Sequence, residues 1–157
     1  MIHAKQFFMI LSIVLVAASG SLAGDTKGKQ PIKIELVVEE IDGASAYQFA
    51  AAEVVRTQFA QEFKIVPGDT EAIELYVMGT NISRGCGCQY LDVRLKKWVS
   101  TWVGNRPVMR PVQLEAFGTM LCGYTEEQRA QSVKEYTYKV LSKFLETLSS
   151  SPEEGKP

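Results

Sequence analysis

Histidine is almost absent from this chain, and its scarcity narrows the chemistry available to the protein. Among 157 residues the only histidine is His3, which lies in an N-terminal segment that we expect to be removed. A mature chain without histidine has no Ser-His-Asp triad, no Cys-His pair and no histidine-ligated zinc site. The sequence also lacks a P-loop, a Gly-x-Gly-x-x-Gly turn and a Gly-x-Ser-x-Gly turn. Because no pattern brings two acidic residues to one site, we expect a non-enzymatic protein with no catalytic residues, metal or cofactor.

A large excess of either charge is absent too. The 17 Lys and Arg residues nearly balance the 18 Asp and Glu residues, which leaves a formal net charge of −1. Domains that bind nucleic acid usually carry a strongly basic face, so we do not expect nucleic acid as a partner. With 46% apolar and 22% charged residues, the composition is typical of one globular domain.

Long apolar runs are missing except near the N-terminus. Lys5 is followed by the apolar residues 7–18, and Ser21 and Ala23 then occupy the −3 and −1 positions before Gly24. This order is typical of a secretory signal peptide, and the run is shorter than the roughly 20 residues of a transmembrane helix. We therefore expect a periplasmic or secreted protein with no transmembrane segment after cleavage; an uncleaved N-terminal anchor is the alternative.

The sequence predicts a single folded unit after the signal. The expected organisation is a signal peptide at residues 1–23, a flexible lead at 24–30, one α+β domain at 31–148 and a disordered tail at 149–157. Capping-box spacing at Ser45 and Gln48, and again at Thr125 and Gln128, marks the starts of two helices.

Residue patterns inside the domain predict its secondary structure. Strand-like alternation and turn signals give strands at residues 32–39, 64–66, 73–80, 90–99 and 112–122, with helices at 45–63 and 125–148. Short connections between the last three strands favour an antiparallel meander. We therefore predict an α+β two-layer sandwich, in which a mainly antiparallel sheet of four or five strands carries both helices on one face. The first strand and the short one can be parallel neighbours, joined by the crossover through the first helix.

The three cysteines suggest a disulfide, because exported proteins fold in an oxidising compartment. A turn at residues 104–107 would place Cys88 close to opposite Cys122, so we predict that this pair is bonded, with Cys86–Cys122 as the alternative. Alternation, however, turns odd residues of one strand and even residues of the next toward the core. The pairing therefore requires a bulge, for which Gly87, Gly118 and Gly123 are candidates.

The sheet face away from the helices is the first candidate for a binding surface. Alternation assigns to it Tyr76, Met78, Tyr90, Asp92, Arg94, Trp98, Glu115, Phe117 and Leu121. Aromatic and charged residues are mixed on this face, as at protein interfaces, although scattered surface aromatics are the alternative. Glu74 and Arg94 are expected to form a cross-strand ion pair.

The stretch at residues 98–110 is the second candidate, since it holds both tryptophans and two arginines. These residue types suit an acidic or glycan ligand, although packing across a long hairpin also explains the tryptophans. Together, the two surfaces give as candidate binding residues Tyr76, Tyr90, Arg94, Trp98, Trp102, Arg106 and Phe117.

Two functional hypotheses follow from these residues. The first is a secreted or periplasmic binding or accessory module that contacts a protein or an envelope component through the outer sheet face and the long hairpin. The second is a thiol redox or soft-metal-binding protein that uses Cys86, Cys88 and Cys122. Either hypothesis is compatible with a homodimer.

Overall fold

The computed structural model describes residues 30–40, 44–82 and 87–150. Within these ranges the elements are β1 (Ile32–Glu40), α1 (Ala44–Gln58), β2 (Phe63–Ile65), β3 (Ile73–Asn81), β4 (Cys88–Val103), β5 (Arg106–Cys122) and α2 (Glu126–Ser150). The expectations for the signal peptide, for the lead as far as residue 29, for Cys86 and for the tail beyond Ser150 lie outside the described residues.

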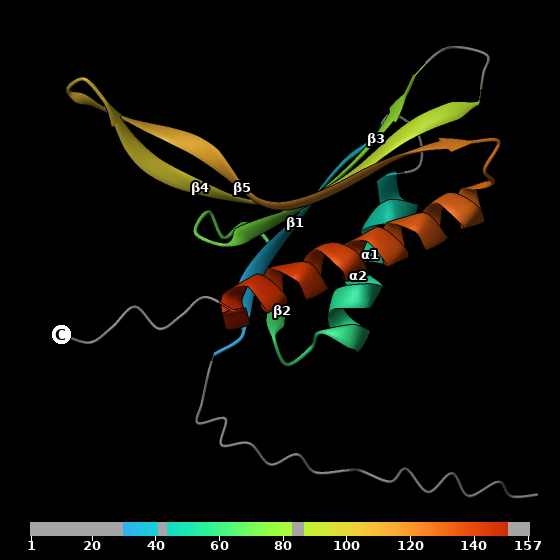
Figure 1. Cartoon of the computed structure of the whole chain (residues 1–157), viewed down its shortest axis with the longest axis horizontal. Coiled ribbons are helices and arrows are strands. Elements are labelled where there is room, and N and C mark those ends of the chain that lie inside the picture. The colour runs from blue at the N-terminus through green and yellow to red at the C-terminus, as the bar shows by residue number, and fades with distance from the viewer. Residues whose placement is uncertain (1–29, 41–43, 83–86, 151–157) are drawn as a thin grey trace, which may run out of the picture.

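The strands form one five-stranded sheet in the order β2-β1-β3-β4-β5. β1 pairs in parallel with both β2 and β3, whereas β3, β4 and β5 pair antiparallel in sequence order. Figure 1 shows α1 and α2 together on one face of this sheet. The predicted α+β class, the antiparallel meander and the parallel pairing of β1 with β2 are therefore confirmed.

The core lies between the sheet and the two helices, as the alternating and helical patterns require. From the strands it takes Ile34, Phe63, Leu75, Val77, Leu91, Val93, Leu95 and Leu121. From the helices it takes Tyr47, Ala50, Ala51, Val54, Val55, Phe59 at the end of α1, Val133, Val140, Leu141 and Phe144. In neither helix of the described ranges is there a stretch with the length and apolarity needed to cross a membrane.

The helix boundaries differ from prediction at three ends. α1 begins at Ala44, so Ser45 lies inside the helix rather than at its N-cap. The helix stops at Gln58 because the chain then turns, with the Phe63 N–H donating to the Phe59 carbonyl at 2.9 Å, and leads into β2. α2 extends to Ser150, two residues beyond its predicted end.

The capping box of α2 has both of its predicted hydrogen bonds. The Thr125 N–H donates to Gln128 Oε1 at 2.9 Å, and the Gln128 N–H donates to Thr125 Oγ1 at 3.3 Å. This reciprocal pair satisfies two backbone donors that have no partner inside the helix.

The predicted orientation of β5 was wrong, because a β-bulge reverses its alternation. Leu95 pairs with Glu115 while Lys96 pairs with Gln113, so Leu114 is the extra residue, and none of the three candidate glycines is. On the disulfide side of this bulge, odd residues face the helices: Leu121 is buried, and Phe117 stacks on Tyr136 of α2.

Glu115, Phe117 and Leu121 therefore do not lie on the outer sheet face. Glu115 confirms the same orientation, since it bonds Lys143 of α2 at 3.0 Å. The even residues of β5 looked like the core set because Val112 and Leu114 are apolar, but that alternation does not carry across the bulge to Ala116 and Met120.

The same geometry accounts for the disulfide. Cys88 pairs directly with Cys122 in the β4–β5 ladder, and a disulfide joins the two residues. The prediction of this bridge is confirmed, and the Cys86–Cys122 alternative is not the one formed.

Candidate functional site

The centre of the outer sheet face is a polar cluster around Tyr76 of β3. The Tyr76 hydroxyl donates to a carboxylate oxygen of Glu39 on β1. Two cations of β4 lie against its ring, with Lys96 Nζ 3.6 Å and Arg94 Cζ 5.8 Å from the centroid. Burial of the phenol, together with the hydrogen bond to Glu39, raises the pKa of Tyr76 to about 12. The side chain therefore stays neutral at physiological pH.

The charged residues of this cluster are paired with one another. Lys96 Nζ lies 3.2 Å from Glu74 Oε2, and the Trp98 indole N–H donates to Glu74 Oε1 at 2.5 Å. Arg94 forms its ion pair with Asp92. The predicted Glu74–Arg94 pair was wrong, because the register places Glu74 opposite Lys96. Both cations of the cluster are therefore already paired with carboxylates of the chain, and Glu39 accepts a hydrogen bond from the Tyr76 hydroxyl.

Tyr90 has a local structural role beside the disulfide. It lies next to Gly118 of β5, where an added Cβ atom would collide with the Tyr90 hydroxyl. The tyrosine ring therefore covers the strand at a position that has no side chain. Tyr90 is nevertheless 38% exposed, so part of its ring remains available at the surface.

β4 and β5 continue past the two helices as a hairpin that projects from the body of the protein (Figure 1). We call residues 96–113 of this hairpin the arm. Its turn is at Gly104-Asn105, where Gly104 has a φ of 62° that favours glycine. Exposed large apolar side chains are concentrated here: Trp98, Val99, Trp102, Val103, Val108, Met109 and Val112.

The register divides the arm into two faces. Odd residues of β4 point to the helix side in the core, so even residues and their partners form the opposite face. We call this opposite face, from the Trp98–Pro111 pair to the turn, the Trp face, and it consists of Trp98, Ser100, Trp102, Pro107, Met109 and Pro111. The pair Lys96–Gln113 lies at its base. The other is the Val face, and it consists of Lys97, Val99, Thr101, Val103, Arg106, Val108, Arg110 and Val112.

The seven predicted binding residues are thus distributed over four places. Tyr76, Arg94 and Trp98 meet at the polar cluster, and Tyr90 lies near the disulfide. Trp102 and Arg106 lie on the arm, whereas Phe117 faces α2. The sequence analysis missed Pro107 and Met109 as members of the Trp face. Pro107 lies as far after the Gly104-Asn105 turn as Trp102 lies before it, and Met109 corresponds to Ser100 in the same way. Counting outward from the turn would have identified both residues.

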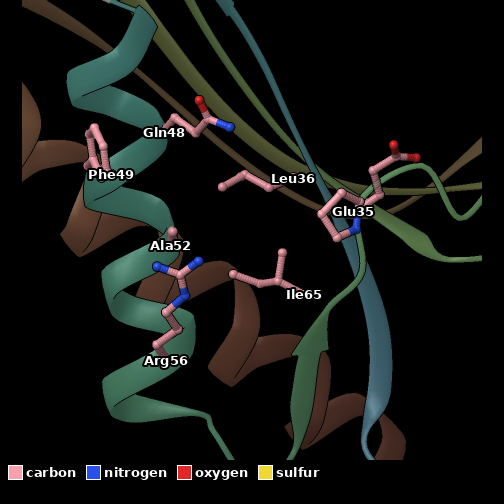
Figure 2. Close-up of a pocket in the computed structure, with 8 residues that line it drawn as sticks. Glu35, Leu36, Gln48, Phe49, Ala52, Arg56 and Ile65 are labelled. Atoms are coloured by element: carbon pink, nitrogen blue, oxygen red, sulfur yellow. The ribbon is translucent and has the colours of Figure 1, made fainter.

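A small cavity of about 300 Å³ lies between α1 and β1 (Figure 2), and none of its lining residues belongs to the arm. Its apolar lining includes Leu36, Ala52 and Ile65, with Arg56 and Glu35 at its margin. The cavity forms because β2 pairs only with Ile32–Ile34 and leaves the next part of the β1 edge without a strand partner among the described residues. Sequence analysis missed it, since it depends on where β2 stops.

The described ranges contain no group of three or more His, Cys, Asp or Glu residues that could hold a metal ion. Cys88 and Cys122 are joined in the disulfide. The Glu35 carboxylate at the cavity accepts a hydrogen bond from the Gly68 N–H at 3.0 Å.

Comparison with known proteins does not assign a function to this chain. No protein-family model matches the chain, and no curated protein has significant similarity to it.

Proposed function

We propose that this protein is a non-enzymatic, periplasmic or secreted binding module that contacts a protein or a component of the cell envelope through its arm. The outer sheet face, which continues from the arm to Tyr90 beside the disulfide, forms the adjoining part of the contact surface. The observation that carries the proposal is the exposure of large apolar side chains on a projecting hairpin.

The exposure is greatest toward the end of the arm. Trp102 is 69% exposed and Met109 is 55% exposed. A two-stranded hairpin is marginally stable alone, and a contiguous apolar surface on a water-facing protein usually marks an interaction site. Tryptophan, methionine and arginine are also enriched where interfaces derive their binding energy.

The disulfide supports the proposed periplasmic or secreted location, and it joins the two strands that form the arm. A Cys88–Cys122 bond is typical of an oxidising environment, in agreement with the signal-like N-terminal segment. It fastens β4 to β5 at the end opposite the turn, across the sheet from the arm. The alternative function in thiol redox or metal binding would require this bond to be reduced first, and it has less support.

Envelope association of matched variants tests the proposal. The variant Trp102→Ser/Met109→Ser removes two exposed apolar side chains from the arm. The control Phe49→Ser/Leu148→Ser removes two side chains of similar exposure, 73% and 50%, from the helices. We expect the arm variant to shift from the envelope fraction to the soluble fraction while the control behaves like the wild type. Equal fractionation of all three proteins would contradict the proposal.

A further inference from the structure

We propose, on the basis of the binding function inferred above, that the partner of the arm is a lipid bilayer containing anionic phospholipid. The arm lies at the level of the headgroups, where its Trp face contacts the boundary with the acyl chains and its cations contact the phosphates.

The Trp face has the composition of an interfacial anchor. Trp98 lies opposite Pro111, Ser100 opposite Met109 and Trp102 opposite Pro107, so no charged side chain occurs on this face beyond the Lys96–Gln113 pair at its base. Tryptophan is enriched at both membrane–water boundaries because its ring is largely apolar while its N–H is polar. The face is therefore suited to the region between water and hydrocarbon.

The charge of the arm has one sign. Residues 96–113 include Lys96, Lys97, Arg106 and Arg110 and no acidic residue. Lys96 is paired with Glu74, and the Lys97 ammonium donates to the Glu71 carbonyl. Arg106 and Arg110 have no acidic partner among the described residues. Long arginine side chains can reach past a thin ribbon to phosphates beside it, so these two side chains favour an anionic surface.

Three features of the arm argue against a second copy of the chain, or a strand of another protein, as its binding partner. Two copies meeting through their arms would bring like charges together. β5 is the edge strand of the sheet, and Pro107 and Pro111 have no N–H to offer an added strand. The Trp face has few side-chain groups that can form hydrogen bonds with a partner, chiefly the Ser100 hydroxyl and the Trp102 indole N–H. It therefore offers few directional contacts for recognising a protein. Apolar contact with added charge attraction is, by contrast, sufficient for a lipid surface.

Vesicle binding of the exported, disulfide-bonded protein tests this inference with an internal probe. Both tryptophans of the chain lie on the Trp face, so tryptophan emission reports only on the arm. We expect flotation with phosphatidylcholine–phosphatidylglycerol vesicles, a blue shift of the emission and protection from aqueous acrylamide. Affinity for phosphatidylcholine vesicles alone should be lower by about tenfold or more, and added salt should weaken the binding.

A pair of charge-matched variants assigns the binding to the arm. Arg106→Gln/Arg110→Gln should lower the affinity for the anionic vesicles by about tenfold or more. Arg56→Gln/Lys64→Gln removes the same charge from exposed positions on α1 and β2 and should bind like the wild type. All four positions are exposed, so unfolding midpoints should stay close to that of the wild type.

Three results would overturn the lipid assignment. They are an absence of binding to anionic vesicles, an equal loss in the two charge variants, and dimerisation that depends on the arm. Another pattern is also informative: the wild type does not bind vesicles, but Trp102→Ser/Met109→Ser shifts the protein from the envelope fraction to the soluble fraction. In that case the partner is a protein and the proposed function stands. If neither assay depends on the arm, both proposals are wrong.

Discussion

Gly79 of β3 lies where Tyr47 of α1 packs closely against the sheet. Above it, the buried Tyr47 hydroxyl donates to Gln89 Oε1 at 2.6 Å, which gives this buried amide a partner inside the core. A Cβ atom at position 79 would lie 2.8 Å from Gln89 Nε2 and 2.9 Å from the Tyr47 ring. Only glycine leaves room for this polar pair.

Gly79→Ala should therefore destabilise the protein by about 1–3 kcal/mol, the usual cost of overpacking a core. Chemical denaturation measures the change in the free energy of unfolding. The neighbouring Thr80→Ala substitution on the other sheet face serves as the control and should cost less. A neutral Gly79→Ala would show that Tyr47 and Gln89 can move apart without loss.

The raised pKa of Tyr76 predicts that the protein loses stability at alkaline pH. Burial and the bond to Glu39 raise the pKa of Tyr76 from 10.0 to about 12, so the folded protein holds this proton more tightly than the unfolded chain does. The resulting stabilisation is complete below pH 10 and disappears as the pH rises toward 12. Denaturation at stepped pH should show a smaller alkaline loss for Tyr76→Phe than for the wild type. Identical pH profiles would contradict the assignment.

At the scale of elements, aromatic packing holds the two helices on the sheet. The Phe63 ring of β2 lies 6.0 Å from that of Phe59, at the end of α1, and 6.3 Å from that of Phe144 in α2. Phe59→Ala and Phe144→Ala should each cost about 3–5 kcal/mol by denaturant unfolding, because each leaves a cavity in the core. Phe49→Ala, at a position that is 73% exposed, should cost little. Losses below about 1 kcal/mol for both core variants would show that these helix faces are not packed as described.

The disulfide should contribute strongly to stability because it closes a loop between residues 34 positions apart. In the chain-entropy model a loop of this length is worth about 3–4 kcal/mol, and the double variant Cys88→Ala/Cys122→Ala should lose that amount. Non-reducing peptide mapping checks the linkage itself. Recovery of both cysteines as free thiols from exported protein would contradict it.

Local patterns predicted the elements well, because alternation and capping depend on near neighbours in the chain. The strand of Leu91, Val93 and Leu95 and the Thr125–Gln128 capping box are cases in which local information was sufficient. The orientation of Phe117 was not predictable in this way. One extra residue at Leu114 changes which side chains face the helices, and the sequence contains no glycine there to mark the bulge.

At the scale of the whole molecule, the arrangement of strands depends on contacts between distant segments. β1 lies between β2 and β3, and its parallel pairing with β3 joins segments separated by all of α1 and β2. No local pattern specifies that neighbour. The candidate site was predicted only in part for the same reason: Trp102 and Arg106 were identified, whereas their separation from the Tyr76 cluster required the structure.

Charge is also separated across the molecule. The arm is wholly cationic, although the chain as a whole carries a formal net charge of −1, so the rest of the protein is net acidic. An anionic surface would attract the arm and repel the body. At an anionic surface this asymmetry would orient the protein with the arm toward the surface and the helices away from it.

The most direct test of the central claim, that the arm is the contact surface, is photocrosslinking in intact cells. A photoreactive residue replaces Ser100, between the two tryptophans of the Trp face, or Gln61, which is exposed in the turn after α1. We expect a discrete adduct with an envelope component from position 100 and none from position 61. Absence of an adduct at position 100, or the same adducts from both positions, would contradict it.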